Sequence, residues 1–442
     1  MRVVLSILMC FVLFLNHAQD VNLYPTNGVK QQKDLYYAFT NATLHISGSL
    51  TTKGTLLIQN GKIVKVGAIV SLPKGTVKLD MKGKHIYPSF VDVYSNYGQP
   101  EIKQGKHDPR PQLETKKKGA FGWNEAVRPE YNTSDHFTAN QKSAKELRNI
   151  GFGSVLTHRM DGIARGTAAL VSLNEGKDRD LIIDPIASTH YSFTKGSSRQ
   201  SYPSSLMGAI ALLRQTFCDA DYYSKNKNDL SLDLSLEAFQ RNTSLPQIVE
   251  ANDKFTILRA DTIGDEFGHQ FIFKGSGNEY QRAKEIKATG GAVIIPLDFP
   301  KPYDVSDAYA ARLVTLAQMK HWELAPSNPK ILAANNIDFA ITTYGLQKKT
   351  DFFGNIRKAI ARGLSEADAL NALTSEPARM INAQDRVGGL GVGMLANFLV
   401  CSGELFEKNT VIYSNWVQGD EFVINPMDLV DIRGTPSRHT CS

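Results

Sequence analysis

Short hydrophobic runs separated by turn residues dominate the first eighty residues of the chain. Residues 42–46, 55–59 and 62–66 are rich in β-branched side chains and have the length of strands. Asn60-Gly61 lies between the second and third runs, and this dipeptide between hydrophobic runs is a strong signal for a tight hairpin. So few strands cannot cover a core by themselves. The pattern therefore predicts a small β-sandwich that is completed by strands from elsewhere in the chain.

The missing strands are expected near the other end, where further hydrophobic runs occupy residues 393–401, 410–418 and 421–424. Between the two groups, strand-like and helix-like patterns alternate. Strands are expected at residues 153–158, 181–183, 187–191, 246–252, 271–275, 292–297 and 337–344. Helices are expected at residues 143–150, 202–223, 254–267, 279–288, 307–320, 352–362 and 365–374. This alternation predicts the α/β fold class, with a TIM-type (β/α) barrel inserted into a small β-sandwich formed by both chain ends.

Residues 84–96 join the two predicted parts, and their aromatic and β-branched centre predicts one buried strand. Alternate side chains of a strand share a face, so Asp92, Tyr94 and Asn96 are expected to point the same way. If this strand opens a barrel, the three side chains lie at its carboxyl end, where barrel enzymes keep their chemistry. The stretch after it, residues 99–128, is polar and has no strong period, and it is interpreted either as a lid or binding loop or as a disordered surface insertion.

The composition restricts the classes of function. A formal charge of +6 over 442 residues, with lysines and acids interspersed, does not indicate nucleic-acid binding, and the run Lys116-Lys117-Lys118 is interpreted as a solvated loop.

Residues 1–19 combine Arg2, an apolar run and a short polar segment, which predicts a signal peptide and a secreted or periplasmic protein. No later window has the length of a transmembrane helix. Cys218, Cys401 and Cys441 are too scattered for a disulfide framework or a zinc site.

A resemblance to a known family rests on two stretches. Pro88-Ser89-Phe90-Val91-Asp92-Val93-Tyr94-Ser95-Asn96 resembles the Pro-Gly-Phe-hydrophobic-Asp-x-His-x-His strand that opens the barrel of amidohydrolase-superfamily enzymes. Trp322-Glu323-Leu324-Ala325-Pro326, followed by Asp338-Phe339-Ala340-Ile341-Thr342-Thr343, is similar to the imidazolonepropionase-like branch. The resemblance covers roughly residues 36–434, and it implies a hydrolase of non-peptide C–N bonds that uses a divalent metal such as zinc.

The metal-ligand motifs are degenerate at every position that the resemblance identifies. Tyr94 and Asn96 replace the two histidines of the first strand, and Glu250 and Lys274 replace single histidines of two middle strands. Tyr344 replaces an aspartate after Thr343. These five residues, with Asp92 and His158 nearby, are the predicted pocket, which contains a Lys–Glu pair. We expect no metal cofactor there, because Lys274 brings a positive charge to the place of the cation. His45 is expected to have a structural or surface role.

Two functional hypotheses follow. In the first, the domain is a pseudoenzyme with a binding or accessory role. In the second, it is an active amidohydrolase with an unusual or metal-free site. The expected partners are a small-molecule or peptide ligand, a second amidohydrolase module or another copy of the chain, with no nucleic acid. The expected organisation is a signal peptide at 1–19, sandwich strands at 20–84, the barrel at 85–384, further sandwich strands at 385–434 and a tail at 435–442.

Overall fold

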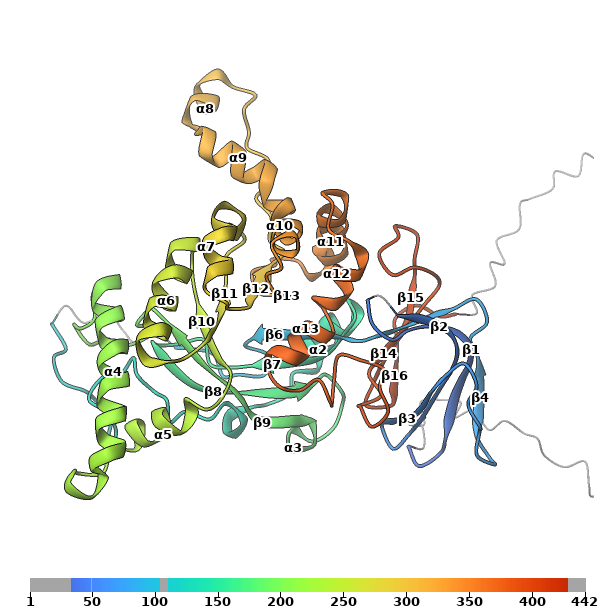
Figure 1. The fold of residues 1–442 in the computed structure, drawn as a ribbon, viewed down its shortest axis with the longest axis horizontal. Helices are drawn as coiled ribbons and strands as arrows, with labels where there is room; N and C mark the ends of the chain where they lie inside the picture. The colour runs from blue at the N-terminus through green and yellow to red at the C-terminus, as the bar shows by residue number, and fades with distance from the viewer. Residues whose placement is uncertain (1–32, 49, 104–109, 428–442) are drawn as a thin grey trace, which may run out of the picture.

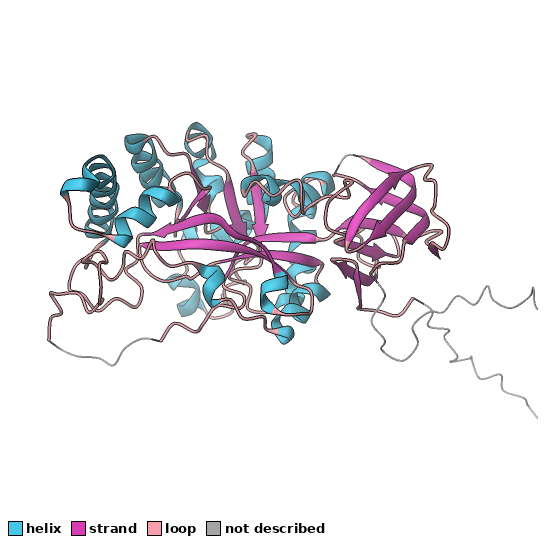
Figure 2. Cartoon of the chain, turned by 90° about the horizontal axis from the view of Figure 1, so that it is seen from below, coloured by secondary structure: helices cyan, strands magenta, loops and turns pink. Residues whose placement is uncertain are grey.

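Two eight-stranded sheets form the framework of the molecule (Figures 1 and 2). The structure, a computed structural model, describes residues 33–48, 50–103 and 110–427. The predicted signal peptide at 1–19 and the tail at 435–442 lie outside the described residues. In both views the sheet built from the two chain ends stands beside the larger α/β part.

The first sheet combines strands from both ends of the chain, as the sequence predicts. Its hydrogen-bonded order is β16-β15-β14-β5-β1-β2-β3, and β4 pairs with β1. The strands are β1 (Tyr37–His45), β2 (Thr51–Gln59), β3 (Lys62–Gly67), β4 (Val77–Asp80), β5 (His85–Pro88), β14 (Phe398–Cys401), β15 (Ile412–Val417) and β16 (Asp420–Val423). The turn between β2 and β3 is the predicted hairpin: Asn60 and Gly61 have φ of 52° and 72°, the positive values that a type I′ turn requires.

The joining stretch is two strands instead of the one predicted. β5 belongs to the first sheet, and β6 (Phe90–Ser95) opens the second. Ser89 lies between them, where its backbone N–H donates to the Asn397 carbonyl at 3.0 Å and its hydroxyl donates to Asn415 Oδ1 at 2.7 Å. The continuous hydrophobic pattern hides this change of sheet because both strands are almost completely buried.

The second sheet has the order β13-β12-β11-β10-β9-β8-β7-β6. After β6 its strands are β7 (Phe152–Thr157), β8 (Ala164–Ser172), β9 (Ile182–Ser192), β10 (Gln247–Glu250), β11 (Phe271–Lys274), β12 (Val293–Pro296) and β13 (Phe339–Thr342). Its pairs are parallel except that β8 runs antiparallel to both β7 and β9. In the described part of the chain no backbone ladder joins β13 to β6, so a regular closed (β/α) barrel is not found.

Strand β8 is the strand of the second sheet that the sequence pattern does not predict. All nine of its residues are buried, so it has no alternation of polar and apolar positions, and it contains Ala and Gly, which have low strand propensity. The neighbouring prediction of two short strands is also wrong, because residues 182–192 form the single strand β9. Pro185 lies inside β9, near a register shift in its pairing with β8.

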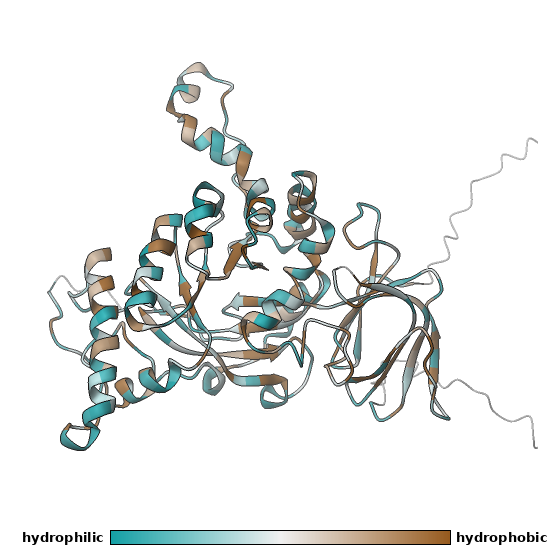
Figure 3. Ribbon diagram, viewed as in Figure 1, coloured by the Kyte–Doolittle hydropathy of each residue, from teal (hydrophilic) through white to brown (hydrophobic). Residues whose placement is uncertain are grey.

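Helices follow most parallel strands and cover the second sheet (Figure 1). The α-helices are α2 (Gln141–Asn149), α3 (Asp178–Leu181), α4 (Leu206–Asn226), α5 (Leu234–Asn242), α6 (Lys254–Phe267), α7 (Ala283–Ala288), α8 (Ala308–Leu313), α9 (Leu316–Leu324), α10 (Asn328–Ala334), α11 (Phe352–Ala361), α12 (Glu366–Asn371) and α13 (Ser375–Met380). Short 3₁₀ turns are η1 (Thr133–His136), η2 (Lys227–Asp229), η3 (Glu279–Arg282), η4 (Ala325–Ser327) and η5 (Lys349–Asp351). Hydrophilic and hydrophobic residues alternate along these helices (Figure 3). Among the described residues, no helix combines the length and apolarity needed to cross a bilayer.

The predicted helix at 307–320 is broken into α8 and α9, which project from the rest of the molecule (Figure 1). The break falls at Val314, whose backbone is extended, and Thr315 then starts α9 with a capping box to Gln318. Large apolar side chains of this arm are exposed, including Tyr309, Leu313 and Leu316. Neither helix has a buried residue, so the arm has no core contact of its own.

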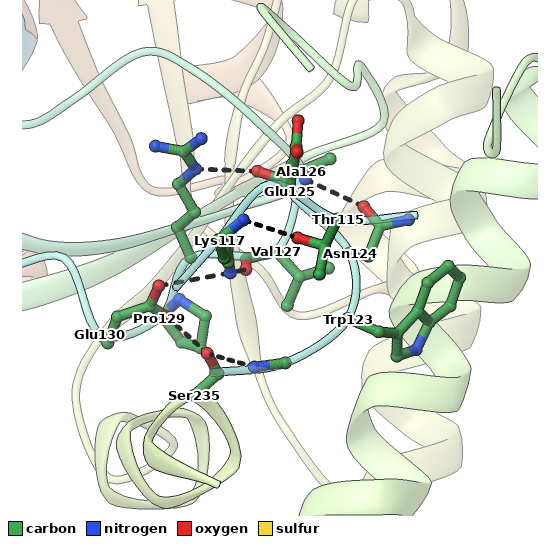
Figure 4. Close-up of polar contacts among 12 residues, drawn as sticks. Thr115, Lys117, Trp123, Asn124, Glu125, Ala126, Val127, Pro129, Glu130 and Ser235 are labelled. Atoms are coloured by element: carbon green, nitrogen blue, oxygen red, sulfur yellow. Dashed lines mark hydrogen bonds and ion pairs between the residues drawn. The ribbon is translucent and has the colours of Figure 1, made fainter. Parts of the chain in front are cut away.

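The described part of the loop at 99–128 packs against the body of the protein. Lys117 Nζ donates to the Val127 carbonyl at 2.6 Å and lies 3.3 Å from Glu130 Oε1, while Ser235 Oγ donates to Glu130 Oε2 at 2.9 Å (Figure 4). Only 10% of the Lys117 side chain is exposed, so the interpretation of Lys116-Lys117-Lys118 as a solvated loop is wrong for its central residue. Burial lowers the pKa of Lys117 despite the charge of Glu130.

Candidate functional site

A buried carboxylate holds together the two ends of the second sheet. Asp92 on β6 is fully buried, and each of its oxygens accepts hydrogen bonds. Oδ1 accepts from Thr342 Oγ1 on β13 at 2.7 Å and from the Tyr94 N–H at 3.1 Å. Oδ2 accepts from the N–H and the hydroxyl of Thr343 at 2.9 and 2.7 Å. Asp92 therefore connects β6 to β13 although the two strands share no backbone ladder.

Arg165 is at the centre of the polar cluster that surrounds Tyr94. Its Nη1 donates to the Tyr94 hydroxyl at 3.0 Å, its Nη2 donates to Glu250 Oε2 at 2.6 Å, and its Nε donates to the Gly162 carbonyl at 3.1 Å. The arginine is 3% exposed, so the ion pair with Glu250 is almost completely removed from water. Such a pair is stable only when the charged groups are well hydrogen-bonded, as Arg165 is here.

The charges of this cluster shift the pKa values of its members. Burial raises the pKa of Glu250, but the guanidinium of Arg165, together with Lys274 and Tyr94, lowers it more and leaves that pKa below its ordinary value. Burial lowers the pKa of Arg165, but Tyr94 and Glu250 raise it further than burial lowers it. Burial also raises the pKa of the Tyr94 phenol. At neutral pH the cluster therefore consists of a carboxylate, a guanidinium and a neutral phenol.

Lys274 and Tyr344 complete the cluster on its other side. Lys274 Nζ lies 4.8 Å from the centre of the Tyr344 ring and 5.5 Å from that of Tyr94, within cation–π range of both. The two tyrosine rings meet edge to face with centroids 5.1 Å apart. Burial lowers the pKa of Lys274, and the charges of Glu250 and Glu279 act against that effect. A lysine with a lowered pKa is the chemically most reactive member of this group.

Two buried histidines pack beside Tyr94. His158 stacks on His190 with ring centroids 3.7 Å apart, and the Tyr94 ring lies 4.7 Å from that of His158. His190 Nε2 is 3.0 Å from Ser188 Oγ, whereas both ring nitrogens of His158 and Nδ1 of His190 have no hydrogen-bond partner among the described residues. Burial lowers the pKa of both rings, and the charge of Arg165 lowers each further. Both imidazoles are therefore neutral at physiological pH.

Asn96 does not join this cluster, so that part of the predicted site is wrong. It follows the end of β6, its side chain is exposed, and it lines a separate surface pocket of about 640 Å³ with Ser95, Gln99, Glu146 and Lys349. The alternation expected over residues 92–96 fails because the pairing of β6 with β7 shifts register between Asp92 and Ser95. The other predicted residues, Tyr94, Glu250, Lys274 and Tyr344, are brought together.

Two glycines let the polypeptide approach closely where Arg165 lies. A Cβ at Gly166, which has φ of +79°, would lie 2.1 Å from the Tyr131 carbonyl oxygen, and one at Gly162 would lie 2.6 Å from that of Ala126. A side chain at either position would push away the end of the 99–128 loop or the residues just after it. This part of the chain therefore packs against the start of β8, which carries Arg165.

The donor set does not fit the divalent ion that the resemblance implies. Glu250, the only acid among the five predicted ligand positions, is already paired with Arg165. His158 and His190 offer neutral nitrogens, but both rings lie close enough to Arg165 for its positive charge to lower their pKa values. Lys274, whose pKa burial lowers, adds a second positive charge when it is protonated. Arg165, and Lys274 in its protonated form, occupy the environment in which a metal cation would have to bind, and repulsion at low dielectric disfavours such binding. No chemical step through a metal is therefore derived for this cluster.

The predicted pocket does not include two residues that decide the character of the site, Arg165 and His190. Arg165 lies in strand β8, which the periodicity does not predict, and His190 lies in β9, which was predicted as two short strands. The available signal was the density of charged and imidazole side chains in His158-Arg159-Met160-Asp161 followed by Arg165. Such a group between buried segments indicates a polar interior, but it does not identify the Glu250 partner, which is 85 positions away in the chain.

Comparisons with known proteins give the fold. Neither a protein-family model nor a curated protein sequence matches the chain. Among solved structures, an amidohydrolase from Thermotoga maritima MSB8 is similar at 23% sequence identity and a TM-score of 0.68, covering 88% of this chain and 100% of that chain. Molinate hydrolase is similar at 12% identity and 0.52, covering 93% and 100%.

A β-aspartyl dipeptidase from Fervidobacterium islandicum AW-1 is similar at 13% identity and a TM-score of 0.52, covering 90% of this chain and 100% of that chain. These likenesses extend over nearly the whole of each protein. They therefore include both the first sheet, which is built from the two chain ends and is called the composite sheet below, and the larger α/β part. The chain has the fold of the amidohydrolases.

Proposed function

We propose that the chain is an exported member of the amidohydrolase superfamily, of the imidazolonepropionase-like branch, whose barrel is non-catalytic and serves binding or assembly. The fold of its structural neighbours supports the superfamily. Under this proposal the second sheet is a degenerate TIM-type barrel, in which the hydrogen bonds from Asp92 to β13 take the place of backbone closure. The small-molecule or peptide ligand, the second module and the self-association expected from the sequence remain part of the proposal.

One observation carries the proposal of inactivity: a protein cation occupies the centre of the residues that should bind a metal. Metal-dependent hydrolysis requires an ion that brings bound water to a pKa near 7. Arg165 instead neutralises Glu250 at 2.6 Å and hydrogen-bonds Tyr94, and Lys274 lies beside both tyrosines. A protonated guanidinium has no lone pair to act as a base or nucleophile.

A second candidate function is favoured by Lys274. Its pKa is lowered by burial, and the phenol of Tyr344 lies beside it. A lysine in such surroundings can act as a nucleophile or a general base without a metal. The chain would then be an active C–N hydrolase with a metal-free site, and Glu250 would set the charge of Lys274.

Hydrolysis assays separate the two functions. The substrates are a β-aspartyl dipeptide and molinate, taken from the names of the similar proteins. The full chain is assayed with added Zn²⁺, with added Mn²⁺ and with chelator, beside Lys274→Met and the surface control Lys284→Met. We expect all three proteins to release product at the rate of the buffer alone. Turnover by the wild type that Lys284→Met retains and Lys274→Met loses would contradict inactivity and establish the second candidate.

A further inference from the structure

A second group of metal-ligating side chains lies in the composite sheet, outside the cluster around Arg165. His45 is at the end of β1, His85 begins the parallel neighbour β5, and Glu404 lies in the turn that follows β14. Among the described residues, this is the one group of three histidine, cysteine or acidic side chains whose ligand atoms all lie within 4.8 Å of one another. It joins segments from opposite ends of the chain.

Two of the three distances between ligand atoms are close to those of a tetrahedral site. His45 Nε2 and His85 Nδ1 are 2.9 Å apart, and His85 Nδ1 is 3.6 Å from Glu404 Oε1. Donors bound tetrahedrally at about 2.0–2.1 Å from zinc lie roughly 3.3–3.4 Å from each other. The two imidazoles would therefore separate by a few tenths of an ångström to admit an ion, a movement within the range of side-chain torsions.

The remaining polar atoms of two of these ligands are held by neighbours, as the outer shell of metal sites requires. Thr51 Oγ1 is 3.2 Å from His45 Nδ1, which leaves Nε2 for an ion. The Tyr87 hydroxyl donates to Glu404 Oε2 at 2.8 Å, which leaves Oε1. The Tyr87 ring also stacks on His45 with centroids 3.8 Å apart. Contacts of this kind fix the tautomer and orientation of the ligands and strengthen binding.

The group is accessible from solvent. The Glu404 side chain is 53% exposed and that of His85 19%, so an ion can reach the group from solvent.

We propose that His45, His85 and Glu404 form a binding site for a divalent transition-metal ion of the zinc class. Two imidazoles and one carboxylate leave a fourth position for water. The ion would cross-link β1, β5 and the turn after β14, and so connect the two chain ends. This site is independent of the proposed inactivity of the larger α/β part, because it shares no residue with the cluster around Arg165.

Zinc titration of the full chain after chelator treatment tests the site. By calorimetry we expect one equivalent of Zn²⁺ per chain and an affinity that falls at least about 100-fold in His85→Gln and in Glu404→Gln. Tyr87→Phe, which removes only the hydroxyl that orients Glu404, is expected to weaken binding about 10-fold. Glu407→Gln, in the same turn, is the matched control and should bind like the wild type. Glu404 is exposed, so its variant keeps the fold, which circular dichroism checks.

Two further measurements are the visible absorption of bound Co²⁺ and the zinc affinity of a variant in the cluster around Arg165. Co²⁺ bound here should give the intense visible absorption of a tetrahedral site in the wild type and lose it in Glu404→Gln. Glu250→Gln should leave zinc affinity unchanged, which separates this site from the cluster around Arg165. The absence of stoichiometric zinc binding, or affinity retained in both His85→Gln and Glu404→Gln, would overturn the proposal.

Discussion

Replacing Asp92 with alanine is expected to lower the free energy of unfolding by about 3–5 kcal/mol. The variant removes a fully buried carboxylate and leaves three donors, the N–H and hydroxyl of Thr343 and the Tyr94 N–H, without their acceptor. Each buried donor left unsatisfied costs about 1–3 kcal/mol, and relaxation of the chain recovers part of the sum. Because Asp92 connects β6 to β13, the loss would also loosen the junction of the two ends of the sheet.

Urea unfolding followed by tryptophan fluorescence measures this effect. Asn96→Ala, four positions along the same segment and exposed, is the control, and its expected change is within about 0.5 kcal/mol. Asp92→Asn should lie between the two, because the amide keeps one acceptor oxygen and places an NH₂ group against donors. A loss below about 1 kcal/mol for Asp92→Ala would mean that the sheet does not depend on this carboxylate.

Arg165→Met is expected to cost about 3–5 kcal/mol of unfolding free energy at neutral pH. Methionine fills much of the arginine volume but leaves the carboxylate of Glu250 buried without its partner. Arg165→Met combined with Glu250→Gln should be more stable than Arg165→Met alone, because the isolated charge is gone. Arg214→Met is the matched control: Arg214 makes two hydrogen bonds to Glu266 at the solvent-exposed surface, where an ion pair contributes little to stability.

The loss of unfolding free energy in Arg165→Met is expected to depend on pH in one direction. In the wild type the folded pKa of Glu250 lies below its unfolded value of 4.5, so its contribution to stability is present above that value and is lost as pH falls through the folded pKa. In Arg165→Met burial dominates and raises the pKa of Glu250, so protonation relieves the penalty as pH falls. The stability difference between the two proteins should therefore shrink from about pH 7 to about pH 4. Equal losses of unfolding free energy in Arg165→Met and Arg214→Met would contradict a stabilising buried pair of Arg165 and Glu250. A stability difference between wild type and Arg165→Met that grows as pH falls would contradict it as well.

Local signals predicted most elements of the fold. The Asn60-Gly61 turn has the backbone angles that its residues favour, and helix α6 has the predicted bounds, 254–267. Two of the errors share one cause: burial on both faces removes the alternation on which strand prediction depends. Strand β8 is buried throughout and was missed, and the change of sheet at Ser89 was hidden inside a continuous hydrophobic run.

The candidate site was predictable only as far as the resemblance reaches. Tyr94, Glu250, Lys274 and Tyr344 come together because each follows or ends a strand that the family pattern identifies. Arg165 lies at the start of the unpredicted strand β8, and its pairing with Glu250 depends on tertiary structure. The exposure of Asn96 depends on a register shift beside Ser95, which no periodicity reveals.

The central claim is that Arg165 and Lys274 occupy the place of the ion in this amidohydrolase fold. Anomalous X-ray scattering at the zinc edge, from crystals grown with excess Zn²⁺, tests it most directly. The account predicts no anomalous peak within coordination distance of Glu250, His158 or His190, whatever is found at His45 and His85. A peak coordinated by Glu250 or by the two buried histidines, with Arg165 displaced from its carboxylate partner, would contradict it.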